Sequence, residues 1–205
     1  MKFPAGPYFT EIFFVNSSIV SSTVDHMARK KIQDRLFEVY IRNAEIRKVI
    51  SDMAARINRD LAGRDVIFLG ILNGAFMFAS DLFREIKLDS QITFLKLASY
   101  AGTSSTGNVK RLIGINEDIY RKTVVILEDI VDTGVTLDNI IKQLKGYEPA
   151  EIKVATMLFK PSSYTKDLQL DYVGIEIPND FVLGYGLDYQ GYGRNLSDLY
   201  REVSH

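Results

Sequence analysis

The chain has 205 residues, of which 46% are hydrophobic and 25% charged, and this is typical of one folded domain. Its 25 basic and 26 acidic residues give a net charge of -1, so charge gives no reason to expect a nucleic acid or a membrane as the main partner. The lack of cysteine excludes a disulfide framework, a thiol nucleophile and a thiolate metal site. No apolar run approaches the roughly 18 residues of a membrane span or the apolar core of a secretory signal, so we expect a cytoplasmic protein.

Residues 1–27 show no clear hydrophobic period and contain two prolines and a serine-rich stretch. We therefore expect them to form an extension outside the main domain, which would cover residues 28–205. The basic run after Met27 resembles the start of a chain. Two alternatives stay open for the extension, namely a disordered segment and an ordered N-terminal strand.

From residue 46 onward, helical and strand patterns alternate. Apolar residues at helical spacing predict a helix over about 46–61, with Asn43 as its N-cap and Gly63 beyond its end. The continuous apolar run 66–72 predicts a buried strand. Further strands are expected at 92–97, 124–127 and 152–159, further helices at 75–86 and 135–144, and a loop at 101–110.

This alternation predicts an α/β fold in which helices flank a parallel sheet. The stretch from about residue 170 is richer in tyrosine, glycine and aspartate and has no helical pattern. We expect it to form a small irregular or β subdomain at the C-terminal end, with Tyr185 and Tyr189 in its core.

The segment 123–137, TVVILEDIVDTGVTL, is the candidate site. Ligands of open parallel sheets bind beyond the carboxyl ends of the strands, and a loop that opens a helix there presents free N–H groups to an anion. Gly134 allows a close approach of the backbone to a phosphate. Glu128, Asp129 and Asp132 would repel that phosphate unless they hold sugar hydroxyls, Mg²⁺ or a proton. A Walker loop and a complete G-x-G-x-x-G string are both missing from the sequence.

This segment resembles the signature that binds 5-phospho-α-D-ribose 1-diphosphate (PRPP) in type I phosphoribosyltransferases. Residues 68–82 resemble the first active-site loop of hypoxanthine-guanine phosphoribosyltransferases, and residues 95–107 resemble their lid. The string ATMLFKPSS resembles their purine-recognition segment, and residues 171–189 resemble the hood that covers the purine. The resemblance spans about residues 36–200. It implies the type I phosphoribosyltransferase fold with a small C-terminal hood from about residue 170.

The resemblance also implies an activity. The enzyme would transfer the 5-phosphoribosyl group from PRPP to hypoxanthine or guanine in purine salvage, with Mg²⁺ as cofactor. Its partners would be PRPP and the purine base, with neither a nucleic acid nor a membrane involved, and the chain would form a homodimer or homotetramer. A lid is required because water would otherwise capture the cationic sugar ring.

Roles of single residues follow from the same resemblance. Asp132 is implied to be the catalytic proton partner at purine N7. The residues implied to bind PRPP are Glu128, Asp129, Ile130, Val131, Asp132, Thr133, Gly134, Val135 and Thr136. Its diphosphate is implied to be bound by Leu72, Asn73 and Gly74, through a non-proline cis peptide, and by Arg194. The residues implied to bind the purine are Lys160, which donates to the 6-oxygen, Tyr172, which stacks on the base, and Val173. The lid is implied to contain Ser99 and Tyr100, and Mg²⁺ to contact Glu128, Asp129 and Asn179.

Two positions depart from the family pattern. Many relatives have Lys where this chain has Asn73, so a positively charged side chain that would contact the diphosphate is lost. Many have Asp where this chain has Asn179, and a neutral amide is a weaker Mg²⁺ ligand. The Mg²⁺ contact implied for Asn179 is weakened accordingly.

Two other functions remain to be weighed. A non-catalytic regulator that senses PRPP and binds RNA or DNA should show a basic face or an added DNA-binding domain. The net charge of -1 and the lack of a helix-turn-helix before residue 40 argue against it. A transferase for adenine, xanthine or a pyrimidine stays open, and the sequence does not rank hypoxanthine, guanine and xanthine.

Overall fold

The computed structural model describes residues 29–99, 110–113 and 117–203. The extension expected at residues 1–27 lies outside them. Within the described residues, no helix is long and apolar enough to cross a membrane.

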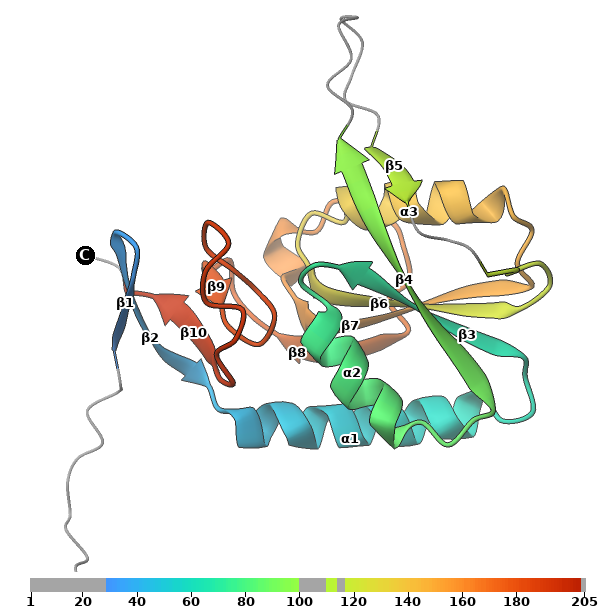
Figure 1. Ribbon diagram of the computed structural model, residues 1–205, viewed down its shortest axis with the longest axis horizontal. Helices are drawn as coiled ribbons and strands as arrows, with labels where there is room; N and C mark the ends of the chain where they lie inside the picture. The colour runs from blue at the N-terminus through green and yellow to red at the C-terminus, as the bar shows by residue number, and fades with distance from the viewer. Residues whose placement is uncertain (1–28, 100–109, 114–116, 204–205) are drawn as a thin grey trace, which may run out of the picture.

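A six-stranded sheet forms the larger part of the molecule, in the order β5-β4-β3-β6-β7-β8 (Figure 1). Its strands are β3 (Val66–Leu72), β4 (Ser90–Ser99), β5 (Lys110–Ile113), β6 (Thr123–Val131), β7 (Glu151–Phe159) and β8 (Tyr172–Glu176). All neighbouring strands run parallel except β5, which pairs antiparallel with β4 at the edge. The parallel α/β sheet expected from the alternating pattern is therefore confirmed.

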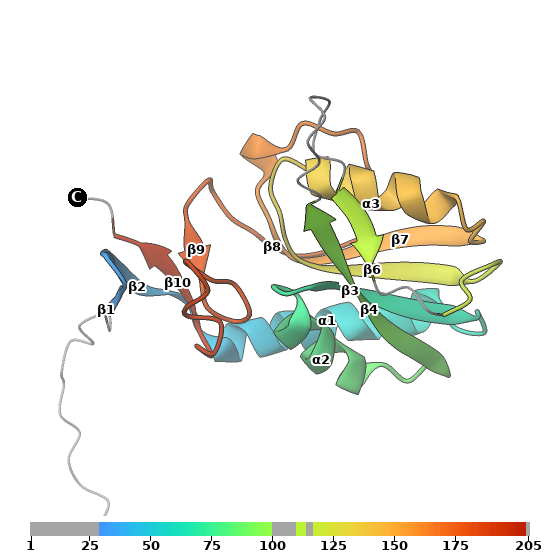
Figure 2. The same ribbon diagram turned by 45° about the horizontal axis from the view of Figure 1, so that its top comes forward.

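Three helices cover the two faces of this sheet (Figure 2). Helices α1 (Asn43–Asp60) and α2 (Phe76–Glu85) pack on one face, and α3 (Val135–Lys145) packs on the other. Alternate residues of β3 point to opposite faces of the sheet, because Phe68 packs with α1 and α2 whereas Ile67 and Leu69 pack with α3. Burial of both faces explains why the strands are continuous apolar runs in the sequence. A 3₁₀ turn, η1 (Pro161–Ser163), follows β7.

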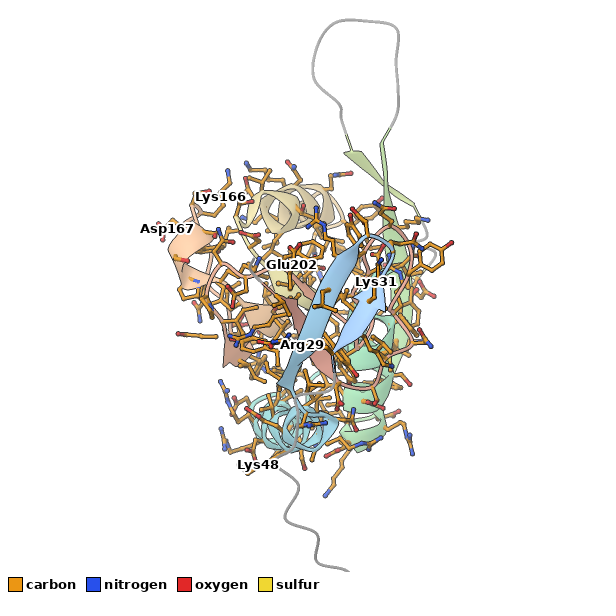
Figure 3. The ribbon with its side chains drawn as sticks, turned by 90° about the vertical axis from the view of Figure 1, so that its left-hand side faces the viewer. Arg29, Lys31, Lys48, Lys166, Asp167 and Glu202 are labelled. Atoms are coloured by element: carbon orange, nitrogen blue, oxygen red, sulfur yellow. The ribbon has the colours of Figure 1, made fainter. Side chains whose placement is uncertain are left out.

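A second, antiparallel sheet of four strands stands beside the first, in the order β1-β2-β10-β9. Its strands are β1 (Lys30–Ile32), β2 (Arg35–Ile41), β9 (Val182–Leu183) and β10 (Leu199–Glu202). We call this sheet, together with residues 177–198, the hood. Figure 3 views the molecule from this side, with the β1–β2 hairpin in front of the main domain.

The hood differs from the expected C-terminal subdomain in two respects. Half of its strands come from residues 30–41, because β2 pairs with β10 from the other end of the described chain. The hood also begins after β8, not near residue 170, because β8 pairs in parallel with β7 and completes the main sheet. Neither long-range pairing leaves a signal in local sequence.

The start of α1 is tied to the hood. Asn43 is the first helical residue and not the N-cap. Its backbone N–H donates to Asp198 Oδ1 at 2.7 Å, and its side-chain amide donates to the carbonyl of Ser197 at 2.9 Å. A carboxylate from the hood thus supplies the hydrogen bond that an N-cap side chain would give.

Candidate active site

A pocket of about 90 Å³ opens where β6 ends and α3 begins. It is lined by Glu128, Ile130, Val131, Asp132, Thr133, Gly134, Thr136 and Leu137. All of these except Leu137 are among the residues that the resemblance implies to bind PRPP. Strand β6 runs through Val131, so the two acidic residues lie within the strand and not after it as expected. The ladder to β7 holds Glu128 opposite Thr156.

The loop at the start of α3 is shaped to receive an anion. Gly134 stands at the N-cap position with φ of 78°, and no side chain there caps the helix. A Cβ on Gly134 would lie 2.5 Å from the ring of Tyr164, so only glycine fits. The backbone N–H and the hydroxyl of Thr165 both donate to the carbonyl of Thr133, at 3.2 and 3.1 Å. These two hydrogen bonds hold the loop in place, and the N-terminus of the helix presents its N–H groups to a phosphate.

Glu128 and Asp129 are carboxylates held out of water. Burial raises the pKa of Glu128 well above its ordinary value, and the charge of Asp129 adds to the effect. The Oε2 atom of Glu128 is buried without a hydrogen-bond partner among the described residues. Burial also raises the pKa of Asp129 to about 6, although the N–H of Ile130 and the charge of Arg194 act in the opposite direction. Glu128 Oε2 therefore lacks a hydrogen-bond donor, and a sugar hydroxyl can supply one.

Beside Asp129, three backbone segments meet at close range. A Cβ on Gly74 would lie 1.5 Å from Asp129 Oδ2, so the loop after β3 touches the acidic strand. The peptide between Leu72 and Asn73 in that loop is cis, as the resemblance implied. Arg194 donates to the carbonyl of Gly186 at 2.7 Å, and its charge acts on Asp129. The structure therefore gathers the loop residues 72–74 and Arg194 around Asp129.

Lys160 and Asp132 lie together at the ends of neighbouring strands. Lys160 is only 8% exposed, and its Nζ lies 3.5 Å from Asp132 Oδ2 and 3.4 Å from Asn179 Oδ1. The backbone N–H of Lys160 donates to the carbonyl of Val131 at 2.9 Å. Asn179 therefore lies against Lys160, and its oxygen is directed to an ammonium. This placement does not favour the metal contact implied for Asn179.

Tyr172 and Val173 are not brought to this site. Tyr172 is 3% exposed and packs in the core beneath α1, with the guanidinium of Arg56 over its ring. It pairs with Ala155, five residues before Lys160, which at about 3.3 Å per residue places it roughly 16 Å below the carboxyl edge of the sheet. The ring cannot stack on a ligand held by Lys160, so this assignment was wrong.

Two residues that the sequence analysis missed lie in the hood. Phe181 follows Asn179 by two positions and is 40% exposed, with Tyr189 edge-on to its ring at 5.7 Å. Asp188 forms an ion pair with Arg194, and its charge raises the pKa of Asp129. An aromatic residue directly after the turn at Asn179 was the available signal for Phe181. The pairing of Asp188 with Arg194 depends on the folded hood.

The remaining assignments concern the lid and the metal. Ser99 is the last residue of β4 and pairs with Lys110, whereas Tyr100 lies outside the described residues, so the lid stays a prediction. The described residues contain no cluster of three metal-ligating side chains. Asp129 and Asp188 are carboxylates of this site whose charges act on each other.

Comparison with known proteins identifies the family. Residues 39–190 match the model of the phosphoribosyl transferase domain. The chain is 38% identical over 162 residues to the hypoxanthine-guanine phosphoribosyltransferase of Staphylococcus aureus (strain Mu50), covering 78% of this chain and 90% of that protein. It is likewise 38% identical over 162 residues to the hypoxanthine phosphoribosyltransferase of Escherichia coli (strain K12), covering 78% and 91% of the two chains.

Solved structures agree with these relatives. A crystal structure of a hypoxanthine-guanine phosphoribosyltransferase from Bacillus anthracis matches with a TM-score of 0.72 and 32% identity, over 82% of this chain and 97% of that one. A hypoxanthine phosphoribosyltransferase from Staphylococcus aureus matches with a TM-score of 0.73 and 35% identity, over 81% and 91%. The type I phosphoribosyltransferase fold is therefore confirmed. Sequence, fold and the phosphate loop with its acidic pair agree that the chain belongs to the phosphoribosyltransferases, among the hypoxanthine-guanine phosphoribosyltransferases.

Proposed function

We propose that the chain transfers the 5-phosphoribosyl group of PRPP to hypoxanthine or guanine and releases IMP or GMP with diphosphate. The observation that carries this proposal is the distance of 3.5 Å between Lys160 Nζ and the Oδ2 atom of Asp132, which lines the pocket. A 6-oxopurine presents its 6-oxygen and N7 side by side on one edge. The lysine donates a hydrogen bond to the 6-oxygen, and the aspartate accepts the proton of N7.

The other groups of PRPP find matching partners along the same edge of the sheet. Glu128 and Asp129 accept hydrogen bonds from the two ribose hydroxyls, and the N–H groups of residues 132–136 bind the 5′-phosphate. The diphosphate lies against residues 72–74 and Arg194. Phe181 offers its exposed ring to the face of the base, in place of the buried Tyr172.

The transfer forms one bond and breaks another. The lone pair on purine N9 forms a bond to ribose C1, and the electrons of the bond from C1 to oxygen leave with diphosphate. The proton on N7 passes to the carboxylate of Asp132, which leaves a neutral base in the product. Arg194 and the backbone N–H groups of the loop after β3 stabilise the departing negative charge.

Mg²⁺ belongs to this proposal as the cofactor. Asp129 and Asp188 are the residues that would hold it, and when bound it would neutralise charge on the diphosphate. The family likeness also supports a cytoplasmic homodimer or homotetramer that acts on small molecules, with no nucleic acid or membrane partner.

The test measures the specificity constants for hypoxanthine, guanine and adenine. Lysine has donors and no acceptor, so the amino group of adenine leaves the buried ammonium unpaired. An unpaired buried polar group costs on the order of 1–3 kcal/mol, so we expect the specificity constant for adenine to be lower by about 5- to 150-fold. Lys160→Gln should narrow this preference, mainly by lowering the specificity constants for hypoxanthine and guanine. The reason is that an amide can present either an oxygen or a nitrogen to the base.

Lys48→Gln, which changes an exposed lysine of α1, is the matched control and should keep the wild-type preference. Equal use of adenine and hypoxanthine by the wild type would contradict the proposal. Full discrimination by Lys160→Gln would remove Lys160 from recognition of the base.

A further inference from the structure

Residues 184–186 of the hood have an unusual backbone. Gly184, Tyr185 and Gly186 have φ of 97°, 47° and 99°, so three consecutive residues lie in the left-handed region. A tyrosine is rare there and persists only where the surroundings hold it. Two hydrogen bonds do so, from the N–H of Tyr185 to Leu196 O at 2.8 Å and from the N–H of Gly186 to Arg194 O at 3.0 Å.

The side chain of Tyr185 connects this segment to the main domain. Its ring is 2% exposed, and its hydroxyl donates to Asp81 Oδ2 at 2.8 Å. Burial and the bond to Asp81 raise the pKa of Tyr185, so the hydroxyl keeps its proton. Asp81 lies on α2, the helix that begins two residues after Gly74. Tyr185 thus attaches the hood to the helix that follows the loop of residues 72–74.

The backbone of Gly186 rests directly on that loop. A Cβ on Gly186 would lie 2.1 Å from the carbonyl oxygen of Gly74, and a Cβ on Gly74 would lie 1.5 Å from Asp129 Oδ2. The three residues therefore form a stack in which Gly74 is held between the hood and the acidic strand. Arg194 closes the stack, because it donates to the carbonyl of Gly186 at 2.7 Å.

We propose that residues 184–186 act as a spacer that sets the position of Gly74 against Asp129, with Tyr185 and Gly186 as positioning residues for the diphosphate end of PRPP. This inference rests on the proposed function. The spacer touches neither Lys160 nor Asp132 through any of these contacts, so it acts on PRPP and diphosphate and not on the base. A residue that only stabilised the fold would affect both substrates alike.

The first variant is Gly186→Ala, compared with Gly63→Ala. Gly63 has φ of 76°, and a Cβ there meets nothing within 4 Å, so the control has similar backbone strain without the contact. Displacement of a binding group by about 1 Å can cost on the order of a hundredfold, so we expect the KM for PRPP and the inhibition constant of diphosphate to rise about ten- to a hundredfold in Gly186→Ala. The KM for hypoxanthine should stay at the wild-type value, and Gly63→Ala should change neither constant.

Tyr185→Phe provides a second, milder test that does not depend on the folding of Gly186→Ala. Loss of one buried hydrogen bond should raise the KM for PRPP about three- to tenfold, again without an effect on hypoxanthine. Asp81→Asn keeps an acceptor for the tyrosine hydroxyl and should retain the wild-type KM for PRPP.

The outcomes separate this inference from the proposed function. If the wild type releases no diphosphate from PRPP and hypoxanthine, the proposed function fails. If the wild type is active and Tyr185→Phe leaves the KM for PRPP unchanged, or raises the KM for both substrates by the same factor, the spacer role is overturned.

Discussion

Asp132 and Lys160 hold opposite charges at the place where a purine edge would bind. Lys160 is almost fully buried, and a buried positive charge is costly unless an opposite charge lies close to it. Asp132, which is half-buried, supplies that charge in the absence of substrate. The same pair then presents one donor and one proton acceptor to an incoming base, so the site is prepared before the base arrives.

Asp132→Asn tests the proton role. The amide keeps an oxygen toward Lys160 but cannot take the N7 proton, so we expect kcat to fall about 10²–10⁴-fold, the usual contribution of a general acid–base group. The affinity for PRPP should hardly change, because the loop backbone binds the phosphate. Steady-state kinetics with hypoxanthine and calorimetric binding of PRPP measure the two effects. An unchanged kcat would remove Asp132 from the mechanism.

Two aromatic–valine pairs show what sequence could not decide. Tyr172-Val173 and Phe181-Val182 look alike in the sequence, and the resemblance alone assigned base stacking to the first. The register of β8 against β7 places Tyr172 in the core, whereas Phe181, two positions after Asn179, is exposed. Only pairing between strands distant in sequence separates the two. The acidic pair and the phosphate loop were found because they are local to one strand, turn and helix.

At the level of elements, the helices and central strands follow from local patterns. Helices α2 and α3 begin and end within one residue of expectation, because each has an apolar face at regular spacing. The end of β6 was placed four residues too early, since the acidic pair reads as the start of a loop. Strands β1 and β2 were missed because β2 pairs with β10 from the other end of the described chain, and β1 pairs only with β2.

The cap of α1 provides a prediction for a single element. Asp198→Ala removes the acceptor of the Asn43 N–H, and loss of such a cap costs about 0.5–2 kcal/mol of the free energy of unfolding. Asp198→Asn keeps an acceptor oxygen and should recover most of that loss. Urea unfolding of both variants measures the difference.

Ser197→Ala is the control, since its backbone carbonyl and not its hydroxyl contacts Asn43. The ion pair of Asp198 with Arg42 is long and exposed, so it should add little. Equal stability of Asp198→Ala and the wild type would show that the hood does not cap α1.

For the molecule as a whole, the acidic pair sets a conflict between stability and function. Glu128 and Asp129 have pKa values raised by burial, so the folded state binds their protons more tightly than the unfolded chain does. This contribution to the free energy of unfolding is complete below the ordinary carboxylate pKa. It is lost as the pH rises through the pKa values of the folded state, and for Asp129 that pKa is about 6. At neutral pH the charged carboxylate of Asp129 therefore stays in the site at the expense of stability.

Glu128→Gln should relieve this conflict. We expect its melting temperature to exceed that of the wild type at pH 7.5 and to approach it at pH 5, with a gain of about 2–4 °C for each kcal/mol recovered. Affinity for PRPP should fall at the same time. Calorimetric melting between pH 5 and 8 measures the effect.

Glu45→Gln alters an exposed carboxylate of α1 and should melt with the pH dependence of the wild type. A melting temperature of Glu128→Gln below that of the wild type at pH 7.5 would show that the Glu128 carboxylate stabilises the fold there.

The joining of β2 to β10 has a consequence for biosynthesis. Glu38 and Arg201, which contact across these strands, are 163 positions apart along the chain. A ribosome delivers β1 and β2 first, whereas β10, the partner of β2, emerges only after the whole main sheet. An unfinished chain would therefore carry the phosphate loop and the acidic pair without Phe181, Asp188 or Arg194. The residues of the site are therefore complete only after the hood segment that follows β8 has been synthesised.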